Sequence, residues 1–299
     1  MLMLTAVELR AAVPNVAGDA PGEACHFPQP GEQGTAVKGC TEENSVFVDS
    51  FLYDDEAMEA LHEAEPPQLS RSYCPDVAKP KECLPLNFLS HSLDLQELGF
   101  IFSSRCLGDL KGRTICDVGS RLGPVLWGAY HLSTAERIVG VEMNGWFCDL
   151  QRKIVKSRNL GDRIAVIEAD ICSEQGQKQL READVVVLHN VFEFFGDAAA
   201  IERCWTTVRA CVSRKGQRLV TVPSLEEAIK KIDASRAPNL REWVAEIPLA
   251  YPEKEVDPEQ AQAQEQEGEV AEDDSSDDDD EDEDEETEEF TSIKMYVVK

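Results

Sequence analysis

The chain has 299 residues, of which 42% are hydrophobic, so it can bury one sizeable core and still carry appended segments. Its net charge of −29 is concentrated in residues 265–289, which hold 18 acidic side chains and no Lys or Arg. The rest of the chain has 29 basic against 40 acidic side chains. This surface repels phosphate backbones, which argues against unaided nucleic-acid binding and favours basic partners.

The ten cysteines are spread through apolar segments, which predicts reduced core residues in a protein of the cytoplasm or nucleus. Cys74 and Cys83 lie close together, but no C-x-x-C motif or histidine pair accompanies them, so we expect no metal site. Residues 1–13 are interrupted by Glu8 and Arg10 and do not resemble a signal peptide. No run of about 20 apolar residues occurs, so we expect no membrane partner.

Residues 1–44 mix Pro, Gly, Ala and Glu without a sustained hydrophobic period, which predicts a disordered segment. Residues 45–111 are expected to form a helical extension. It contains a short helix over 54–62, followed by a helix with Leu95, Leu98 and Phe102 on one face. We expect this second helix to pack beside the first strand of the main domain.

From residue 112 onward strands alternate with helices, which predicts a parallel sheet with right-handed crossovers. The expected strands are 114–117, 137–142, 163–167, 184–188 and 217–222, and helices are expected over 145–157, 197–212 and 224–232. Residues 243–249 and 290–298 have strand composition, and we expect them to pair antiparallel at the sheet edge. The acidic residues 253–289 would then be a disordered insertion in that hairpin.

The stretch 114–127 carries the most informative pattern. A short apolar strand ends at Asp117 and runs into a turn that contains Gly119, Ser120 and Gly123. Glycines permit close approach of the backbone to a ligand, and open α/β folds bind ligands at the carboxyl ends of their strands. The stretch therefore predicts a nucleoside-binding turn, with an ordinary strand-turn-helix as the alternative.

Two further acidic residues follow strands. Glu142 ends the second expected strand, and Asp170 follows the third. A carboxylate can accept hydrogen bonds from both hydroxyls of a ribose. Glu142 lies 19 residues beyond Gly123, about the spacing that dinucleotide-binding folds use. A solvated strand end is the alternative for Glu142.

The same turn argues against a nicotinamide-dependent enzyme. The pattern G-x-G-x-x-G would need glycine at positions 121 and 124, where this chain has Arg121 and Pro124. Three orientations are open for Arg121: toward a cofactor carboxylate, toward a substrate, or into solvent.

The strand, the D-x-G-x-x-x-G turn, the acid that ends the second strand and the terminal hairpin together resemble class I S-adenosylmethionine-dependent methyltransferases, over 112–249 and 290–299. The resemblance implies a seven-stranded, Rossmann-like α/β sheet with helices on both faces and a C-terminal antiparallel hairpin. It also implies S-adenosylmethionine as cofactor, with its methionine part at the turn, its ribose at the second strand and its adenine after the third. The implied cofactor-binding residues are Asp117, Gly119, Ser120, Gly123, Glu142, Met143, Asp170, Ile171 and Asn190.

The fourth strand ends in His189 and Asn190 followed by aromatic residues, loosely similar to a loop of Dot1-like histone lysine methyltransferases. This resemblance makes Asn190 and His189 the candidate catalytic residues. Asn190 would accept a hydrogen bond from an incoming amine, and His189 would be a general base or a spacer. Phe192, Phe194 and Phe195 would either wall a dry channel or fill the core.

We therefore expect a methyltransferase that acts on an amine of a basic protein. Methyl transfer to a neutral nucleophile mainly needs in-line positioning, so the chain needs no further catalytic motif. Two alternatives stay open: an RNA or small-molecule methyltransferase, and a non-catalytic protein that uses the fold and its acidic run to bind partners.

Overall fold

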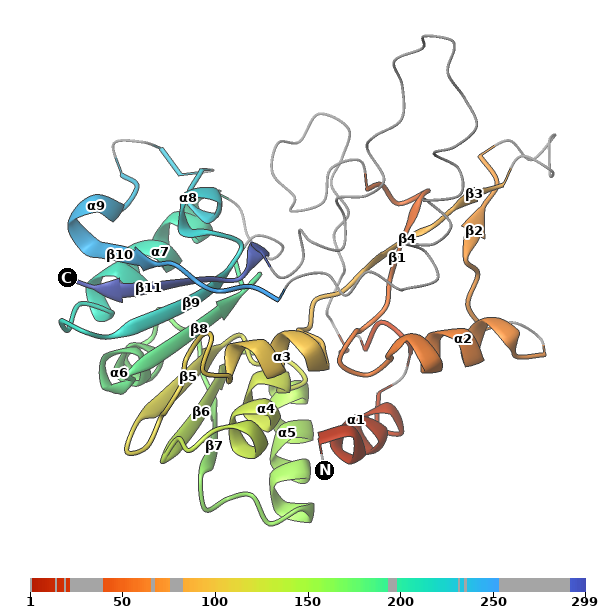
Figure 1. Ribbon diagram of the computed structural model, residues 1–299, viewed down its shortest axis with the longest axis horizontal. Helices are drawn as coiled ribbons and strands as arrows, with labels where there is room; N and C mark the ends of the chain where they lie inside the picture. Colours follow the sequence, from red (N-terminus) through yellow and green to blue (C-terminus); the bar gives the residue numbers. More distant parts are fainter. Residues whose placement is uncertain are drawn as a thin grey trace, which may run out of the picture.

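A seven-stranded sheet with strand order β10-β11-β9-β8-β5-β6-β7 forms the centre of the fold (Figure 1). Its members are β5 (Thr114–Val118), β6 (Arg137–Glu142), β7 (Ile164–Glu168), β8 (Val185–His189), β9 (Arg218–Val222), β10 (Val244–Ile247) and β11 (Lys294–Val298). The strands β5 to β9 are parallel, and β11 is antiparallel to both of its neighbours, β9 and β10. The predicted α/β sheet and its C-terminal antiparallel hairpin are confirmed.

The computed structural model describes residues 2–13, 15–18, 20–21, 40–65, 68–75, 83–192, 198–230, 232–233, 236–252 and 291–299. The predicted disordered insertion at 253–289 lies outside these residues, as do Phe194 and Phe195.

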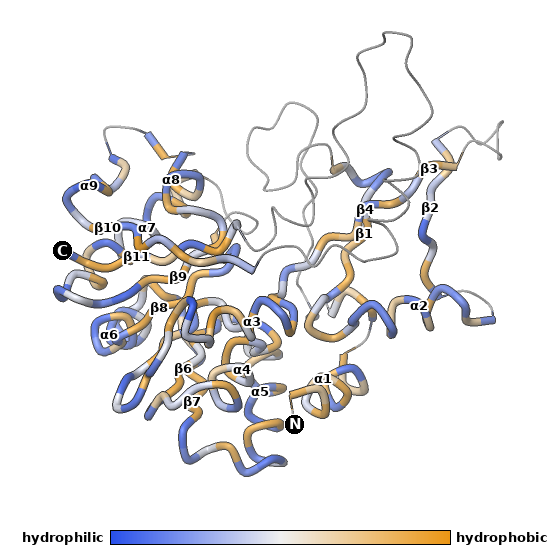
Figure 2. The backbone as a smooth tube through the Cα atoms, viewed as in Figure 1, coloured by the Kyte–Doolittle hydropathy of each residue, from blue (hydrophilic) through white to orange (hydrophobic). Residues whose placement is uncertain are grey.

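Helices cover both faces of the sheet. They are α4 (Pro124–Leu132), α5 (Gly145–Ser157), α6 (Glu174–Glu182), α7 (Ala198–Cys211), α8 (Leu225–Ala228) and α9 (Leu240–Trp243). Buried side chains form two clusters, one with α4 and α5 and the other with α6 and α7. Ile115 belongs to the first and its neighbour Cys116 to the second, because side chains alternate along a strand. Figure 2 shows the central strand β8 in orange and α6 almost entirely in blue.

The N-terminal extension contains more strand than the sequence predicted. Its elements are α1 (Leu2–Arg10), β1 (Ser45–Phe47), α2 (Asp55–Glu63), β2 (Ser72–Tyr73), β3 (Leu84–Pro85), β4 (Asn87–Leu89) and α3 (Leu95–Ile101). The two expected helices are present, and the extension also contains the strand pairs β1–β4 and β2–β3, which the sequence did not predict. Such two- and three-residue strands are too short to leave a period in the sequence.

Helix α3 packs against α4. A Cβ added to Gly128 would lie 3.1 Å from side-chain atoms of both Leu98 and Phe102, so glycine allows the close approach of the two helices. Leu98 and Phe102 therefore face α4. Both belong to the buried cluster that also contains Ile115 of β5, the first strand of the domain.

The described part of 1–44 contains the helix α1, although the composition of this segment predicts disorder. Helix α1 packs against α4 and α5, Leu9 is fully buried, and Glu8 pairs with Arg158 at 2.9 Å. A helix of this length is marginal alone and gains its stability from packing, which local composition does not reveal. Residues 22–39 lie outside the described part.

Cys74 and Cys83 form a disulfide, which corrects the prediction that the cysteines are all reduced. The antiparallel pairing of Tyr73 with Leu84 brings the two flanking cysteines together, with their Cα atoms 4.3 Å apart. Seven other described cysteines are free thiols. Within the described residues no cluster of His, Cys, Asp and Glu is arranged to hold a metal ion, and no described helix has the length and apolar character of a membrane span.

Candidate functional site

The turn after β5 is built from residues in the left-handed region. Gly119 has φ 70°, Arg121 φ 43° and Gly123 φ 80°. The N–H groups of Gly119 and Ser120 donate to the carbonyl of Val141 on the neighbouring strand, at 2.8 and 3.3 Å. Gly123 then caps α4. The turn therefore lies against the carboxyl end of β6, where ligands bind in open α/β folds.

Glu142 fixes the turn to the start of α5. Its side chain is buried, Oε2 accepts the N–H of Arg121 at 2.9 Å, and Oε1 accepts the N–H of Asn144 at 2.8 Å. Asn144 caps α5. Two backbone donors therefore hold the carboxylate in one orientation at the end of β6.

A second carboxyl group lies nearby at the end of β5. Asp117 is buried, and desolvation together with the negative charge of Glu142 raises its pKa well above its usual range. A cation bound beside Asp117 would favour its ionised form. Ser120, by contrast, is engaged in the fold: its hydroxyl is hydrogen-bonded to Gln151 of α5, and the Gln151 amide also donates to the carbonyl of Arg121 at 2.6 Å.

Arg121 is directed toward the extension, an orientation that the sequence did not predict. Its side chain is 9% exposed, and Nη1 pairs with Oδ2 of Asp49 at 2.8 Å. Nη2 donates to the carbonyl of Ala17 at 3.2 Å, and the guanidinium stands 5.3 Å from the ring centroid of Phe147. The sequence feature that could have indicated this ion pair is Asp49, an isolated acidic residue in the apolar stretch 46–53.

The carboxyl end of β8 supplies the two candidate catalytic residues. Burial lowers the pKa of His189 to about 4, although a hydrogen bond with the His91 backbone opposes the shift, so His189 is neutral at physiological pH. Asn190 has φ 48°, and its N–H donates to Val222 at 2.7 Å. Its buried Oδ1 has no hydrogen-bond partner among the described residues. Because such an acceptor is costly, Oδ1 marks a place where the donor of a ligand would fit.

A cavity of about 20 Å³ lies at the carboxyl ends of β5 and β8. It is lined among others by Asp117, Gly119, His189 and the segment His91–Leu93. This volume holds about one water molecule. Val191 packs closely on Gly119, since a Cβ added to Gly119 would lie only 2.4 Å from Cγ2 of Val191. The sequence did not predict that His91–Leu93 would form a wall of the site.

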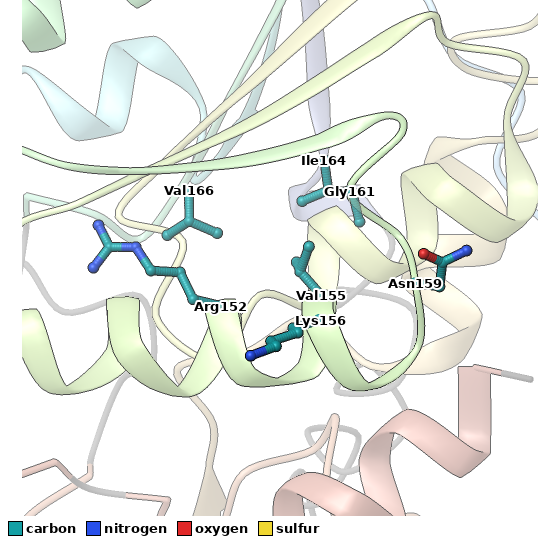
Figure 3. A pocket seen from close by; sticks show the side chains of 7 residues that line it. All are labelled: Arg152, Val155, Lys156, Asn159, Gly161, Ile164 and Val166. Carbon is teal, nitrogen blue, oxygen red and sulfur yellow. The ribbon is translucent and has the colours of Figure 1, made fainter.

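A larger hollow of about 340 Å³ lies between α5 and the amino end of β7 (Figure 3). Val155, Ile164 and Val166 supply apolar surface, and Arg152 and Lys156 supply positive charge. It contains none of the predicted site residues and is separate from the carboxyl edge of the sheet.

The remaining predicted residues lie beyond Glu142. Met143 is 74% exposed and Ile171 is buried. Asp170 is exposed, and its Oδ1 accepts the N–H of Cys172 at 2.7 Å. Phe192 is buried, with its ring 5.3 Å from that of Trp205 in an edge-to-face contact, so it fills the core.

The side chains present match the donors and acceptors of S-adenosylmethionine. The carboxyl groups of Asp117 and Glu142 and the unpartnered Oδ1 of Asn190 are hydrogen-bond acceptors, the kind of group that ribose hydroxyls and an ammonium group would need. The volume of the site does not match this cofactor in the present conformation, because a cavity of about 20 Å³ is far smaller than a nucleoside. Binding would require the segment His91–Leu93 to move.

No protein-family model and no curated protein matches the sequence. Solved structures match over part of the chain. The pyocyanin biosynthetic protein PhzM is 22% identical with a TM-score of 0.35, over 43% of this chain and 36% of that protein. An RNA methyltransferase from Salinibacter ruber in complex with S-adenosylhomocysteine is 20% identical with a TM-score of 0.30, over 37% and 65%.

The precorrin-6y C5,15-methyltransferase from Geobacter metallireducens is 18% identical with a TM-score of 0.36, over 47% of this chain and 71% of that protein. The chain thus spans about a third of the length of PhzM and just under two thirds of the RNA methyltransferase. The second and the third of these proteins are methyltransferases. All three similarities are partial and concern the fold alone.

Proposed function

We propose that the protein is an S-adenosylmethionine-dependent methyltransferase that acts on an amine. The observation that carries this proposal is the convergence of Asp117, Glu142 and Asn190 at the carboxyl edge of the sheet, with Oδ1 of Asn190 buried and unpartnered. Strand ends in α/β folds bring together groups that bind a nucleoside, and an unfilled acceptor beside them suits an N–H donor.

The residues have separate roles in this proposal. Glu142 would hold the ribose hydroxyls, Asp170 the adenine, and the turn at Gly119 the methionine part, while Asp117 would face the ammonium group. When bound, S-adenosylmethionine supplies an electrophilic methyl group on a positively charged sulfur. The protein would mainly position the two reactants and exclude water.

The groups at the end of β8 suit an amine substrate. An amine attacks with its lone pair, so a protonated amine must first give up its proton, and His189, which is neutral at physiological pH, would be the general base that accepts it. Asn190 would accept a hydrogen bond from the remaining N–H and orient the nitrogen lone pair. The excess of acidic over basic side chains outside residues 265–289 favours a basic protein as the carrier of this amine.

Calorimetry with S-adenosylhomocysteine tests cofactor binding. We expect micromolar affinity, roughly −8 kcal/mol, for the native protein. Glu142→Gln should weaken binding by about 1.5–3 kcal/mol, because a charged acceptor is lost. Glu168→Gln is the matched control, since Glu168 pairs in register with Glu142 on the neighbouring strand but lies outside the turn. Absence of heat and of a thermal shift at millimolar ligand would contradict the proposal.

A transfer assay tests the substrate. The protein is incubated with radiolabelled S-adenosylmethionine and either a basic protein fraction or RNA. Label on lysine or another amine of the protein fraction is the expected result, and transfer should slow as salt screens the attraction between the acidic surface and its substrate. Label in RNA alone would show that the protein-amine substrate is wrong.

The small cavity favours a second candidate function. A site of about 20 Å³ is also what a non-catalytic member of the fold would show, with its acidic surface used to bind partners. Calorimetry separates the two functions, because only the methyltransferase binds S-adenosylhomocysteine.

A further inference from the structure

Two cysteines lie side by side at the edge of the proposed adenine site. Cys172 is in the turn between Asp170 and α6, and Cys204 is on α7, with their Sγ atoms 3.8 Å apart. Both are partly exposed, whereas the other described free thiols are buried. The pair therefore combines mutual contact with access to solvent.

We propose that Cys172 and Cys204 form a modification site, at which a hydroperoxide oxidises the two thiols to an intramolecular disulfide. The Cys172 thiolate attacks one peroxide oxygen, the O–O bond breaks, and the leaving oxygen takes up a proton, which gives a sulfenic acid. The Cys204 sulfur then attacks the sulfenic sulfur, the S–S bond forms, and water leaves. In sum, two thiols and one hydroperoxide give one disulfide, one alcohol or water, and one further water.

The surroundings of the two sulfurs assign their order of reaction. Burial, with the neighbouring Cys172 as a second cause, raises the pKa of Cys204 to about 12, so Cys204 is poorly suited to attack first. Cys172 has a polar neighbour, since Oγ1 of Thr207 lies 3.5 Å from its Sγ and can donate to a thiolate by turning from the carbonyl of Arg203. Cys172 is thus the attacking thiol and Cys204 the resolving thiol.

The geometry allows the bond to form with a small movement. Disulfide sulfurs are about 2.05 Å apart, so the two sulfurs must approach by somewhat less than 2 Å, which rotation of the side chains and a shift of the turn can supply. Helices α6 and α7 already pack against each other. The bond would fasten the turn after β7 to α7 without rearranging the sheet.

The bond would also affect the cofactor site, a consequence that rests on the proposed function. The N–H of Cys172 donates to Oδ1 of Asp170, the residue proposed to contact adenine, so a shift of Cys172 moves this carboxylate. We expect oxidation to weaken S-adenosylhomocysteine binding by roughly fivefold, which is a small effect among the affinity changes that one site typically causes at another.

Peptide mass spectrometry after oxidation tests the modification site without any cofactor. The folded full chain is treated with hydrogen peroxide, quenched, unfolded and alkylated with iodoacetamide. The expected product is a crosslinked peptide that contains Cys172 and Cys204, with both protected from alkylation. In Cys204→Ser, dimedone should label Cys172 as the trapped sulfenic acid. Cys211→Ser is the control. Cys211 is buried and is the last residue of α7, so its replacement should leave the crosslink unchanged.

Met143 serves as an internal measure of exposure to oxidant, because it is 74% exposed. The proposal is overturned if Cys172 and Cys204 stay alkylatable at peroxide doses that convert Met143 to its sulfoxide, or if Cys204→Ser gives no dimedone adduct at Cys172. A crosslink in a protein that does not bind S-adenosylhomocysteine would leave the modification site standing and contradict the proposed function alone.

Discussion

The buried ion pair between Asp49 and Arg121 is the main polar contact that holds the extension on the glycine turn. The side chains are 0% and 9% exposed, and three donors converge on the carboxylate. Arg121 Nη1 and the hydroxyl of Ser92 bind Oδ2 at 2.8 and 2.6 Å, and the N–H of Leu52 binds Oδ1 at 3.1 Å. Asparagine at position 49 has a single oxygen, so its NH2 group would face at least one of these donors.

Asp49→Asn should therefore lower the free energy of unfolding by about 3–5 kcal/mol, the cost of leaving one partner of a buried pair uncompensated. Burial raises the pKa of Asp49 even beside the guanidinium, which shows that desolvation of this pair is expensive. Removing both charges should consequently cost less than removing one. The double variant Asp49→Asn/Arg121→Met should recover most of the loss.

Urea denaturation followed by circular dichroism at pH 7 measures these differences. Glu8→Gln is the control, because it breaks the more exposed pair with Arg158 in the same extension and should cost no more than about 1 kcal/mol. The reasoning fails if Asp49→Asn lies within 1 kcal/mol of the native protein. It also fails if the losses of the two single variants simply add in the double variant.

Three further outcomes are expected. Asp49→Asn should bind S-adenosylhomocysteine more tightly than the native protein, because the same pair holds His91–Leu93 over the site; calorimetry that shows equal or weaker binding would refute this. His189 should titrate near pH 4 by NMR. Because its pKa is lowered in the folded state, it should contribute about 3 kcal/mol of stability above pH 6.5, and this contribution should be lost as the pH falls toward 4. His189→Gln should not show this pH dependence. Gly119→Ala should lower the melting temperature and cost about 1–3 kcal/mol in free energy of unfolding, because position 119 has a positive φ and the new Cβ would clash with Val191. Adding Val191→Ala to this variant should restore only the part of the loss that is due to the clash.

The sheet could be predicted because its signals are local. The apolar runs that became β5 to β9 lie between helices with clear stripes, and the paired composition of 243–249 and 290–298 indicated β10 and β11. The positions of Asp117, Glu142 and Asn190 followed from the same reasoning, since the ends of parallel strands meet at one edge.

Other features depend on partners that are distant in sequence. Arg121 lies 72 residues from Asp49, and nothing in the turn itself indicates that its side chain is directed toward the extension. The order of α1 depends on α4 and α5, and the Cys74–Cys83 disulfide depends on the pairing of β2 with β3. The segment His91–Leu93 lines the small cavity, and no local sequence pattern predicts that this segment lies at the site.

The position of β11 has a consequence for biosynthesis. Strand β10 is held in the described sheet through β11, and β11 also covers the outer edge of β9. Residues 248–293 separate β10 from β11 along the chain. A nascent chain therefore exposes the edge of β9 until β11 has been synthesised and has emerged from the ribosome, and exposed edges of this kind pair readily with other chains. Translation that stops within the acidic run would leave β10 unpaired and one edge of β9 open, so we expect such products to aggregate or to be degraded.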